Sequence, residues 1–132
     1  MYAVEHVAWQ VKDPVAVAKW YCDNLGFRVL RKLDKTPMTH FIEDASGKVV
    51  VEIYNNPAAT VPDYPAMHHL HLHLAFVSEN PDADRDRMVR LGCKVTEDIV
   101  TPAGDKLVMV KDPFGFAIQF CKRAVPMLSE KS

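Results

Sequence analysis

Two stretches of this 132-residue chain repeat one another, and the repeat restricts the possible folds more than any other feature. Residues 6–9 read HVAW and residues 73–76 read HLAF, and each stretch is followed by an acid or an amide and then a proline. A second polar pair keeps the same spacing of 67 residues, because Glu52 in VVEI corresponds to Gln119 in AIQF. The chain therefore contains two similar modules, and each places one copy of a polar pair on strand-like segments.

Each module is expected to run strand, helix, strand, strand, strand. Asp13 followed by Pro14 is a helix-start signal, and Gly26 is a helix-end signal. The alternating and β-branched runs indicate strands. The first module has predicted strands at 4–11, 27–33, 39–43 and 48–54 and a helix at 14–25. The second has predicted strands at 69–77, 93–99, 106–111 and 116–122 and a helix at 81–91.

The segment 55–67 contains three prolines and no strand or helix pattern, which makes it the natural linker. It separates a first module, 1–54, from a second, 68–122, and a polar tail covers 123–132. A half of this size buries too little apolar surface to be stable alone. We therefore expect the two sheets to pair, within one chain or across a homodimer.

Composition excludes several classes of function. The net charge is −1 with both signs scattered, so nothing favours nucleic acid as a partner. The apolar runs are far too short to span a membrane, and the N-terminus lacks the basic and apolar segments of a signal peptide. The three cysteines have no regular spacing, which favours reduced thiols and a cytoplasmic protein.

Strand periodicity places the polar residues of both modules on the sheet face that points away from the helix. In the first strand His6 and Ala8 alternate with bulky apolar residues, and in the corresponding strand His73 and Ala75 do the same. The bulky residues are expected to face the helix of each module. The histidines and the small alanines are then left facing a cavity, where small side chains leave room for a ligand.

The chain resembles a known family in HVAW at 6–9, in WY and LGF within 20–27, in HLAF at 73–76 and in DPFG at 112–115 with Gln119. These motifs are similar to those of the vicinal oxygen chelate superfamily. It includes glyoxalase I, methylmalonyl-CoA epimerase, extradiol dioxygenases, and fosfomycin- and bleomycin-resistance proteins. The resemblance covers about residues 3–122 and implies an α+β fold, with two paired βαβββ modules forming a cupped, mostly antiparallel sheet around the site.

The resemblance also implies four metal ligands, from the first and last strand of each module: His6, Glu52, His73 and Gln119. Such a mixed nitrogen and oxygen set suits one divalent ion, Zn, Ni, Co, Mn or Fe. Members commonly end the second module with a glutamate. Gln119 departs from that pattern, because an amide can coordinate through its carbonyl oxygen but cannot act as a base. If the second module is read before the first, the ligands follow one another as His, Gln, His, Glu. This order is similar to the ligand set of the epimerase branch.

The function implied by this ligand set is a lyase or isomerase that chelates a small α-oxygenated carbonyl substrate and moves a proton. Glu52 is the expected catalytic base. Glu97 or Asp98 is a candidate second acid or base, and periodicity sends only one of them inward. Two alternatives stay open. One is an Fe(II) extradiol-type dioxygenase using two histidines and one carboxylate, and the other is a drug-binding protein of the bleomycin-resistance type without catalysis.

Three further residues are candidate substrate contacts. His69, His71 and His73 alternate with leucines in the predicted strand 69–77, so His71 is expected to share a face with His73. Cys121 shares its strand face with Gln119, and Tyr54 is a candidate for acid–base assistance. His68 and His69, at the end of the linker, are expected to be exposed.

Overall fold

A computed structural model describes residues 1–128. The last four residues of the predicted tail 123–132 lie outside this described part. The chain divides into two compact units, the second of which begins at Asp63, inside the segment 55–67. No helix in residues 1–128 combines the length and the apolar character that a membrane span requires.

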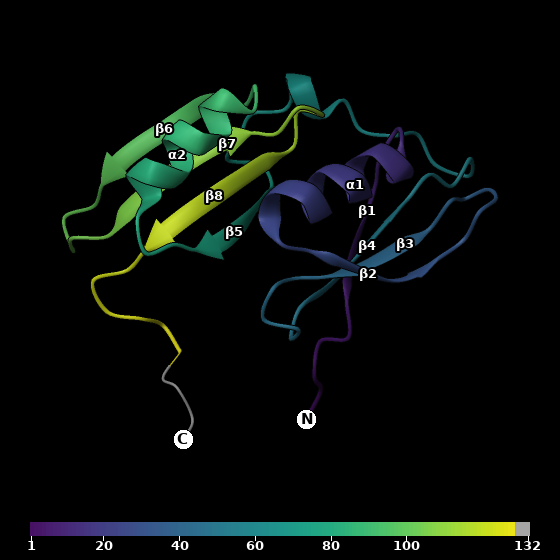
Figure 1. Ribbon diagram of the computed structural model, residues 1–132, viewed down its shortest axis with the longest axis horizontal. Coiled ribbons are helices and arrows are strands. Elements are labelled where there is room, and N and C mark those ends of the chain that lie inside the picture. The colour runs from purple at the N-terminus through teal and green to yellow at the C-terminus, as the bar shows by residue number, and fades with distance from the viewer. Residues whose placement is uncertain (129–132) are drawn as a thin grey trace. The chain divides into compact units, whose positions relative to one another are not determined.

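The first unit is a four-stranded sheet with one helix on one face (Figure 1). Its elements in chain order are β1 (Val7–Gln10), α1 (Pro14–Leu25), β2 (Arg28–Lys32), β3 (His40–Glu43) and β4 (Val50–Tyr54). The strands lie in the order β1-β4-β3-β2, with β1 parallel to β4 and the other two pairs antiparallel.

The second unit repeats this arrangement after a short 3-10 helix, η1 (Tyr64–Ala66). Its elements are β5 (His73–Val77), α2 (Pro81–Arg90), β6 (Lys94–Val100), β7 (Lys106–Lys111) and β8 (Ala117–Lys122). The strand order β5-β8-β7-β6 again contains one parallel pair, β5 with β8, and two antiparallel pairs. The α+β fold of two similar βαβββ modules is confirmed.

The helices begin where the sequence signals predict. Asp13 accepts a hydrogen bond from the backbone N–H of Ala16 at 3.1 Å, and Asn80 accepts one from Ala83 at the same distance. These side chains satisfy N–H groups that have no partner inside a helix. Gly26 ends α1 with φ 75°, the left-handed conformation that a glycine adopts without strain.

The apolar core of each unit lies between its sheet and its helix. In the first unit Val51 and Ile53 are fully buried, and they alternate along β4 with Glu52. In the second, Ile118 and Phe120 are buried in the same way and alternate with Gln119 along β8. We call the sheet face opposite the helix the open face. The polar pairs lie on this face in both units.

Strand β5 is shorter than predicted. It begins at His73, and residues 69–72 form a turn in which the backbone N–H of His71 donates to the carbonyl of His68 at 3.0 Å. The Nδ1 atom of His68 also accepts from the N–H of Leu70 at 3.1 Å. Such local bonds compete with strand pairing. The prediction of one strand face shared by His69, His71 and His73 is therefore wrong.

Candidate functional site

The open face of the first sheet brings His6 to Glu52. Ala8 lies opposite Glu52 across β1 and β4, and Phe41 lies opposite Glu52 across β3 and β4. His6 precedes β1 by one residue, and its ring packs edge-on against Phe41 at a centroid distance of 5.6 Å. The Nε2 atom of His6 lies 3.4 Å from Oε1 of Glu52. The small side chain of Ala8 leaves room beside this pair.

A residue that sequence reasoning missed, Glu5, contacts the ring of His6. Its Nδ1 atom lies 2.8 Å from Oε1 of Glu5. A carboxylate only accepts hydrogen bonds, so this contact places a proton on Nδ1. Holding one ring nitrogen in this way turns the other toward a ligand, as carboxylates do behind metal-binding histidines. An exposed acid near the chain start carries no sequence signal for that role.

The contact between His6 and Glu52 calls for a positive charge. In a neutral ring protonated on Nδ1, Nε2 presents a lone pair to the carboxylate of Glu52. Two electron-pair donors facing each other repel unless a proton or a metal ion lies between them. Two donor atoms each about 2.1 Å from one ion lie about 3.0 to 3.4 Å apart at octahedral or tetrahedral angles. The observed 3.4 Å fits that range.

The open face of the second sheet repeats the arrangement. Ala75 lies opposite Gln119 across β5 and β8, and Met109 lies opposite Gln119 across β7 and β8. His73 stands two residues before Ala75, as His6 stands two residues before Ala8. His73 is exposed, whereas Gln119 is buried. Each unit therefore presents one histidine and one side chain with a polar oxygen in the same register.

The side-chain carbonyl of Gln119 is oriented by Cys121. The Sγ atom of Cys121 donates to Oε1 of Gln119 at 3.1 Å. A carbonyl oxygen has two lone pairs, so this bond leaves one of them for a metal ion. Cys121 is itself buried, and its burial raises the pKa of the thiol. It therefore stays protonated and acts as a donor.

Glu97 and Asp98 point to opposite faces of the second sheet. Asp98 lies opposite the buried Val108, on the face that α2 covers, and bonds to Lys106 and to Arg85 of α2. These two cations, Lys106 first, lower the pKa of Asp98. Glu97 is the inward residue of the two, and it lies on the open face opposite Met109.

The prediction that His69 is exposed is wrong. Its Nε2 atom lies 3.1 Å from Oε2 of Glu97, and its side chain is 17% exposed. His68 is exposed as expected, and its ring stacks on that of His69 at a centroid distance of 4.3 Å.

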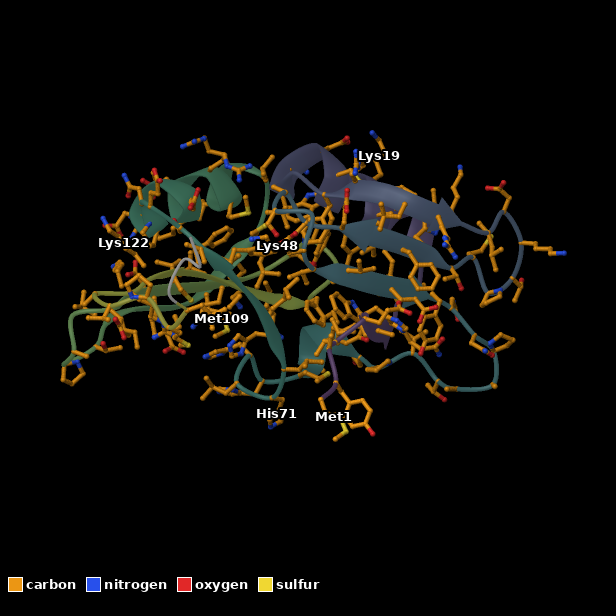
Figure 2. All side chains as sticks on the ribbon, turned by 90° about the horizontal axis from the view of Figure 1, so that it is seen from below. Met1, Lys19, Lys48, His71, Met109 and Lys122 are labelled. Atoms are coloured by element: carbon orange, nitrogen blue, oxygen red, sulfur yellow. The ribbon has the colours of Figure 1, made fainter. Side chains whose placement is uncertain are left out.

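Of the two remaining predicted contacts, only Tyr54 shares a strand face with one of the polar pairs, two residues after Glu52 on β4. His71 is exposed in the turn before β5, and Figure 2 shows it at the surface. Tyr54 ends β4 opposite Gln10 and is half-buried.

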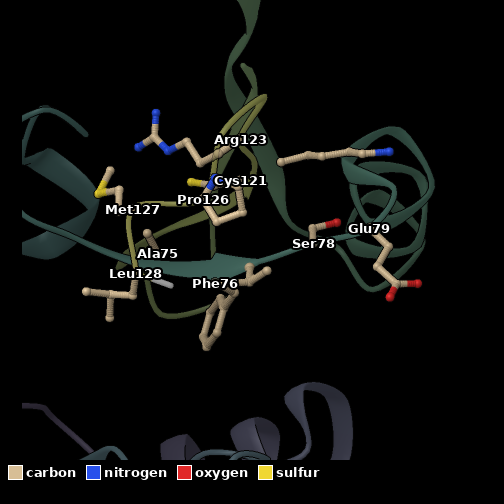
Figure 3. Close-up of a pocket in the computed structure, with 11 residues that line it drawn as sticks. Ala75, Phe76, Ser78, Glu79, Cys121, Arg123, Pro126, Met127 and Leu128 are labelled. Atoms are coloured by element: carbon tan, nitrogen blue, oxygen red, sulfur yellow. The ribbon is translucent and has the colours of Figure 1, made fainter. Parts of the chain in front are cut away.

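The second unit also contains a hollow of about 780 Å³ at the end of β5 (Figure 3). Its wall is largely apolar, and it includes Cys121 from β8 and the segment 126–128. Arg123 also lines it, and this side chain is paired with Asp105 at 3.1 Å. Sequence reasoning missed the hollow because it treated residues after Lys122 only as a polar tail.

In residues 1–128, no three His, Cys, Asp or Glu side chains form a group suited to hold a metal ion. The candidate ligands instead form two pairs, one in each unit, and we call each pair a half-site. One is His6 with Glu52 in the first unit, and the other is His73 with Gln119 in the second. An amide oxygen is the fourth donor of the predicted set.

The buried thiols give a prediction about reactivity. Burial raises the pKa of Cys93 to about 11, and only the thiolate is nucleophilic. A raised pKa lowers the thiolate fraction at pH 8 and so lowers the reaction rate. The greater nucleophilicity of a more basic thiolate offsets part of this loss of rate. We expect iodoacetamide to modify Cys93 at least about tenfold more slowly in the native protein than in urea. Peptide mass spectrometry over a time course measures this, and equal rates would contradict it.

Comparison with known proteins identifies the family. The sequence model of the Glyoxalase/Bleomycin resistance protein/Dioxygenase superfamily matches residues 3–120. No curated protein matches the chain. Among solved structures, the protein SMU.1112c is 27% identical with a TM-score of 0.69, covering 92% of this chain and 99% of that one.

Two more distant structures share the fold. A glyoxalase family protein from Enterococcus faecalis is 23% identical, with a TM-score of 0.67 and coverage of 92% of this chain and 98% of that one. The fosfomycin resistance protein FosX from Listeria monocytogenes is 15% identical, with a TM-score of 0.68 and coverage of 92% and 93%. The family match and the two βαβββ modules agree with the resemblance seen in the motifs. The chain belongs to the Glyoxalase/Bleomycin resistance protein/Dioxygenase superfamily, the vicinal oxygen chelate superfamily.

Proposed function

We propose that the protein is a metal-dependent lyase or isomerase of the glyoxalase or epimerase type, with His6, Glu52, His73 and Gln119 binding one divalent ion. The observation that carries this proposal is in the first half-site. Nε2 of His6 faces the Glu52 carboxylate at 3.4 Å while Glu5 holds Nδ1, which is the arrangement of two ligands awaiting a cation. The second half-site has the same register, with Gln119 in place of the carboxylate.

Two imidazoles, one carboxylate and one amide oxygen suit Zn, Ni, Co, Mn or Fe better than a hard cation such as Ca. When bound, such an ion holds two neighbouring oxygens of a substrate and stabilises the negative charge that develops on them. The substrates suited to that chemistry are small α-oxygenated carbonyl compounds. Their C–H bond beside the carbonyl becomes acidic when the negative charge on the oxygens is stabilised.

Glu52 takes the proton in this proposal. It is the sole carboxylate among the four ligands, and the amide of Gln119 has no basic site at neutral pH. Glu52 is 21% exposed, so a substrate can reach its second oxygen while the first stays near His6. The side chain of Ala8 opposite is too small to block that approach, and the ring of Phe41 gives the site an apolar wall.

The proposal includes a homodimer in the cytoplasm. Cys22, Cys93 and Cys121 are all free in the structure, which suits a reducing compartment. Strands β1 and β5 each form an edge of their sheet, with Val77 of β5 almost fully exposed. An edge with exposed apolar residues favours pairing with another strand.

Metal analysis of protein purified without a histidine tag tests the ligand set. We expect one ion per chain after loading with Zn or Co, and at least tenfold weaker binding in both the His6→Ala and His73→Ala variants. If His73→Ala binds as tightly as the wild type, the shared set is wrong. A chain that takes up no ion refutes the metal proposal. Oxygen uptake by Fe(II)-loaded protein with a catechol would instead indicate the dioxygenase alternative.

A second candidate function is small-molecule binding without catalysis. The hollow of about 780 Å³ favours it, because its largely apolar wall suits a lipophilic ligand. Thermal shifts with a panel of lipophilic cationic drugs test this role. A shift of the same size in the His6→Ala, His73→Ala double variant would favour binding over metal-dependent catalysis.

A further inference from the structure

The hollow at the end of β5 adjoins the second half-site. Ala75 lines the hollow and lies directly opposite Gln119 across β5 and β8. Cys121 lines it as well (Figure 3), and its Sγ atom donates to Oε1 of Gln119 at 3.1 Å. Cys121 and Gln119 are 8% and 7% exposed. The thiol therefore joins the wall of the hollow to a proposed metal ligand through a buried contact.

The thiol of Cys121 favours one orientation of the Gln119 amide. The last torsion of a glutamine side chain has broad minima, so the amide can present either its oxygen or its nitrogen to the same neighbour. Only the oxygen has lone pairs for a metal ion, and a thiol that donates favours the oxygen on its own side. The bond therefore holds the ligand atom in place and leaves its second lone pair for the ion.

The contents of the hollow affect the strength of this bond. A thiol is a weak donor, so water competes with Gln119 for its hydrogen. Water reaches the hollow in solution, because Val77, Met127 and Leu128 of its wall are each 77% exposed or more. An apolar molecule in the hollow displaces that water, and a hydrogen bond is stronger in less polar surroundings. Filling the hollow therefore favours the bond from Cys121 to Gln119.

The polar groups of the wall already have partners within the protein. The hydroxyl group of Ser78 donates to the carboxylate of Asp84. The guanidinium of Arg123 is paired with Asp105 at 3.1 Å. Because these groups are engaged, the wall favours a ligand that needs few hydrogen bonds.

Charge and size narrow the class of ligand further. Glu79 and Lys122 also line the hollow, and both are exposed and of opposite sign, so the wall favours neither an anion nor a cation. A volume of about 780 Å³ suits a small molecule. The four residues that follow Leu128 read SEKS and are too polar for this wall. The expected occupant is a small, uncharged and largely apolar molecule.

We propose that such a molecule binds in the hollow and strengthens metal binding through Cys121. Cys121 is then a positioning residue, which holds the Gln119 amide and touches neither the ion nor the substrate. This inference rests on the proposed function, because it needs the ion at Gln119. Coupling between two ligands is reciprocal, so the ion strengthens binding in the hollow by the same factor.

The neutral fluorescent compound N-phenyl-1-naphthylamine tests this coupling with the full-length protein. We expect its Kd to be about three- to fivefold lower for Zn-loaded than for metal-free protein, which is the effect of one hydrogen bond. The Kd of Zn, measured by competition with a chelator, is expected to fall by the same factor when the probe is saturating. If neither Kd changes, the inference is wrong.

Two variants of Cys121 test the role of the thiol. In Cys121→Ala, which has no donor, each Kd is expected to become independent of the other ligand. Cys121→Ser keeps a donor and is expected to retain a coupling of at least about twofold. Coupling that survives in Cys121→Ala, or that is lost in both variants, overturns the hydrogen-bond link.

A matched pair of variants in the C-terminal segment tests the place of binding. Met127 lines the hollow, whereas Val125 does not, and the two side chains are 77% and 80% exposed. We expect Met127→Asp to raise the Kd of the probe at least about tenfold, because a charge is placed in an apolar wall. Val125→Asp is expected to leave that Kd unchanged. Equal effects would place the probe elsewhere and overturn the inference.

Failure of the proposed function is recognised separately. If the chain binds no Zn, the metal proposal is wrong, and the link is judged on metal-free protein by NMR of the Gln119 side-chain amide. These signals are assigned by their absence in Gln119→Glu. The probe is expected to shift them in the wild type and much less in Cys121→Ala. Equal shifts in the two proteins, or none, overturn the link as well.

Discussion

The Glu52→Gln variant is expected to fold normally and to lose proton transfer by a factor of about 10² to 10⁴. Glutamine has nearly the same shape as glutamate, but its amide cannot accept a proton from carbon. The substitution also removes the negative charge that faces Nε2 of His6 at 3.4 Å. We therefore expect divalent metal affinity to fall in the same variant, by about tenfold or more.

Exchange of hydrogen for deuterium beside the carbonyl of hydroxyacetone, followed by NMR in D₂O, measures proton transfer without knowledge of the natural substrate. Metal content is fixed by loading wild type and variant at saturating Co or Zn. A melting temperature within a few degrees of the wild type shows that the fold is intact. Exchange at the wild-type rate in the saturated variant would exclude Glu52 as the base.

A matched variant moves the carboxylate instead of removing it. Glu52 and Gln119 occupy equivalent positions in the two modules, opposite Ala8 and Ala75 respectively. In the Glu52→Gln, Gln119→Glu double variant the ligand set keeps one carboxylate, and the Cys121 thiol can still donate to residue 119. We expect metal affinity to recover to within about tenfold of the wild type. No recovery would mean that the half-sites are not equivalent toward the ion.

Local signals explain how much of the fold was readable from the sequence. Helix α1 spans residues 14–25 as predicted, because Asp13, Pro14 and Gly26 encode both of its ends. Strand β7 also has its predicted bounds, 106–111. The predicted strand 69–77 begins four residues before β5 and ends with it at Val77, because alternating histidine and leucine is typical of a strand. The bond from Leu70 to the His68 ring favours a turn instead.

Only those parts of the candidate site that depend on strand periodicity could be predicted from the sequence. Alternation placed His6 and Glu52 on one face, and the structure brings their side chains to 3.4 Å. The contact of Glu5 with His6 joins two adjacent residues and depends on their side-chain conformations, which no periodic pattern encodes. The contact of His69 with Glu97 joins a turn to a strand 28 residues away in sequence. Such tertiary contacts require the structure.

The Gly115→Ala variant is expected to lose about 3 to 5 kcal/mol of unfolding free energy, a large part of the total for a domain of this size. Gly115 has φ 88°, and a Cβ atom there would lie 2.5 Å from both the backbone N and Cγ of Pro65. Pro65 cannot easily give way, because Lys111 bonds to its carbonyl and that of Tyr64. Urea denaturation followed by circular dichroism measures the loss.

Gly92→Ala is the matched control that separates backbone strain from the clash. Gly92 has φ 90°, and a Cβ atom there meets no atom within 4 Å. It therefore carries only the cost of a left-handed alanine, about 1 to 2 kcal/mol. The excess loss in Gly115→Ala measures how firmly the segment 64–67 is held against the turn at 112–115. Equal losses in the two variants would mean that this segment moves aside at little cost, and that the close packing on Gly115 contributes little to stability.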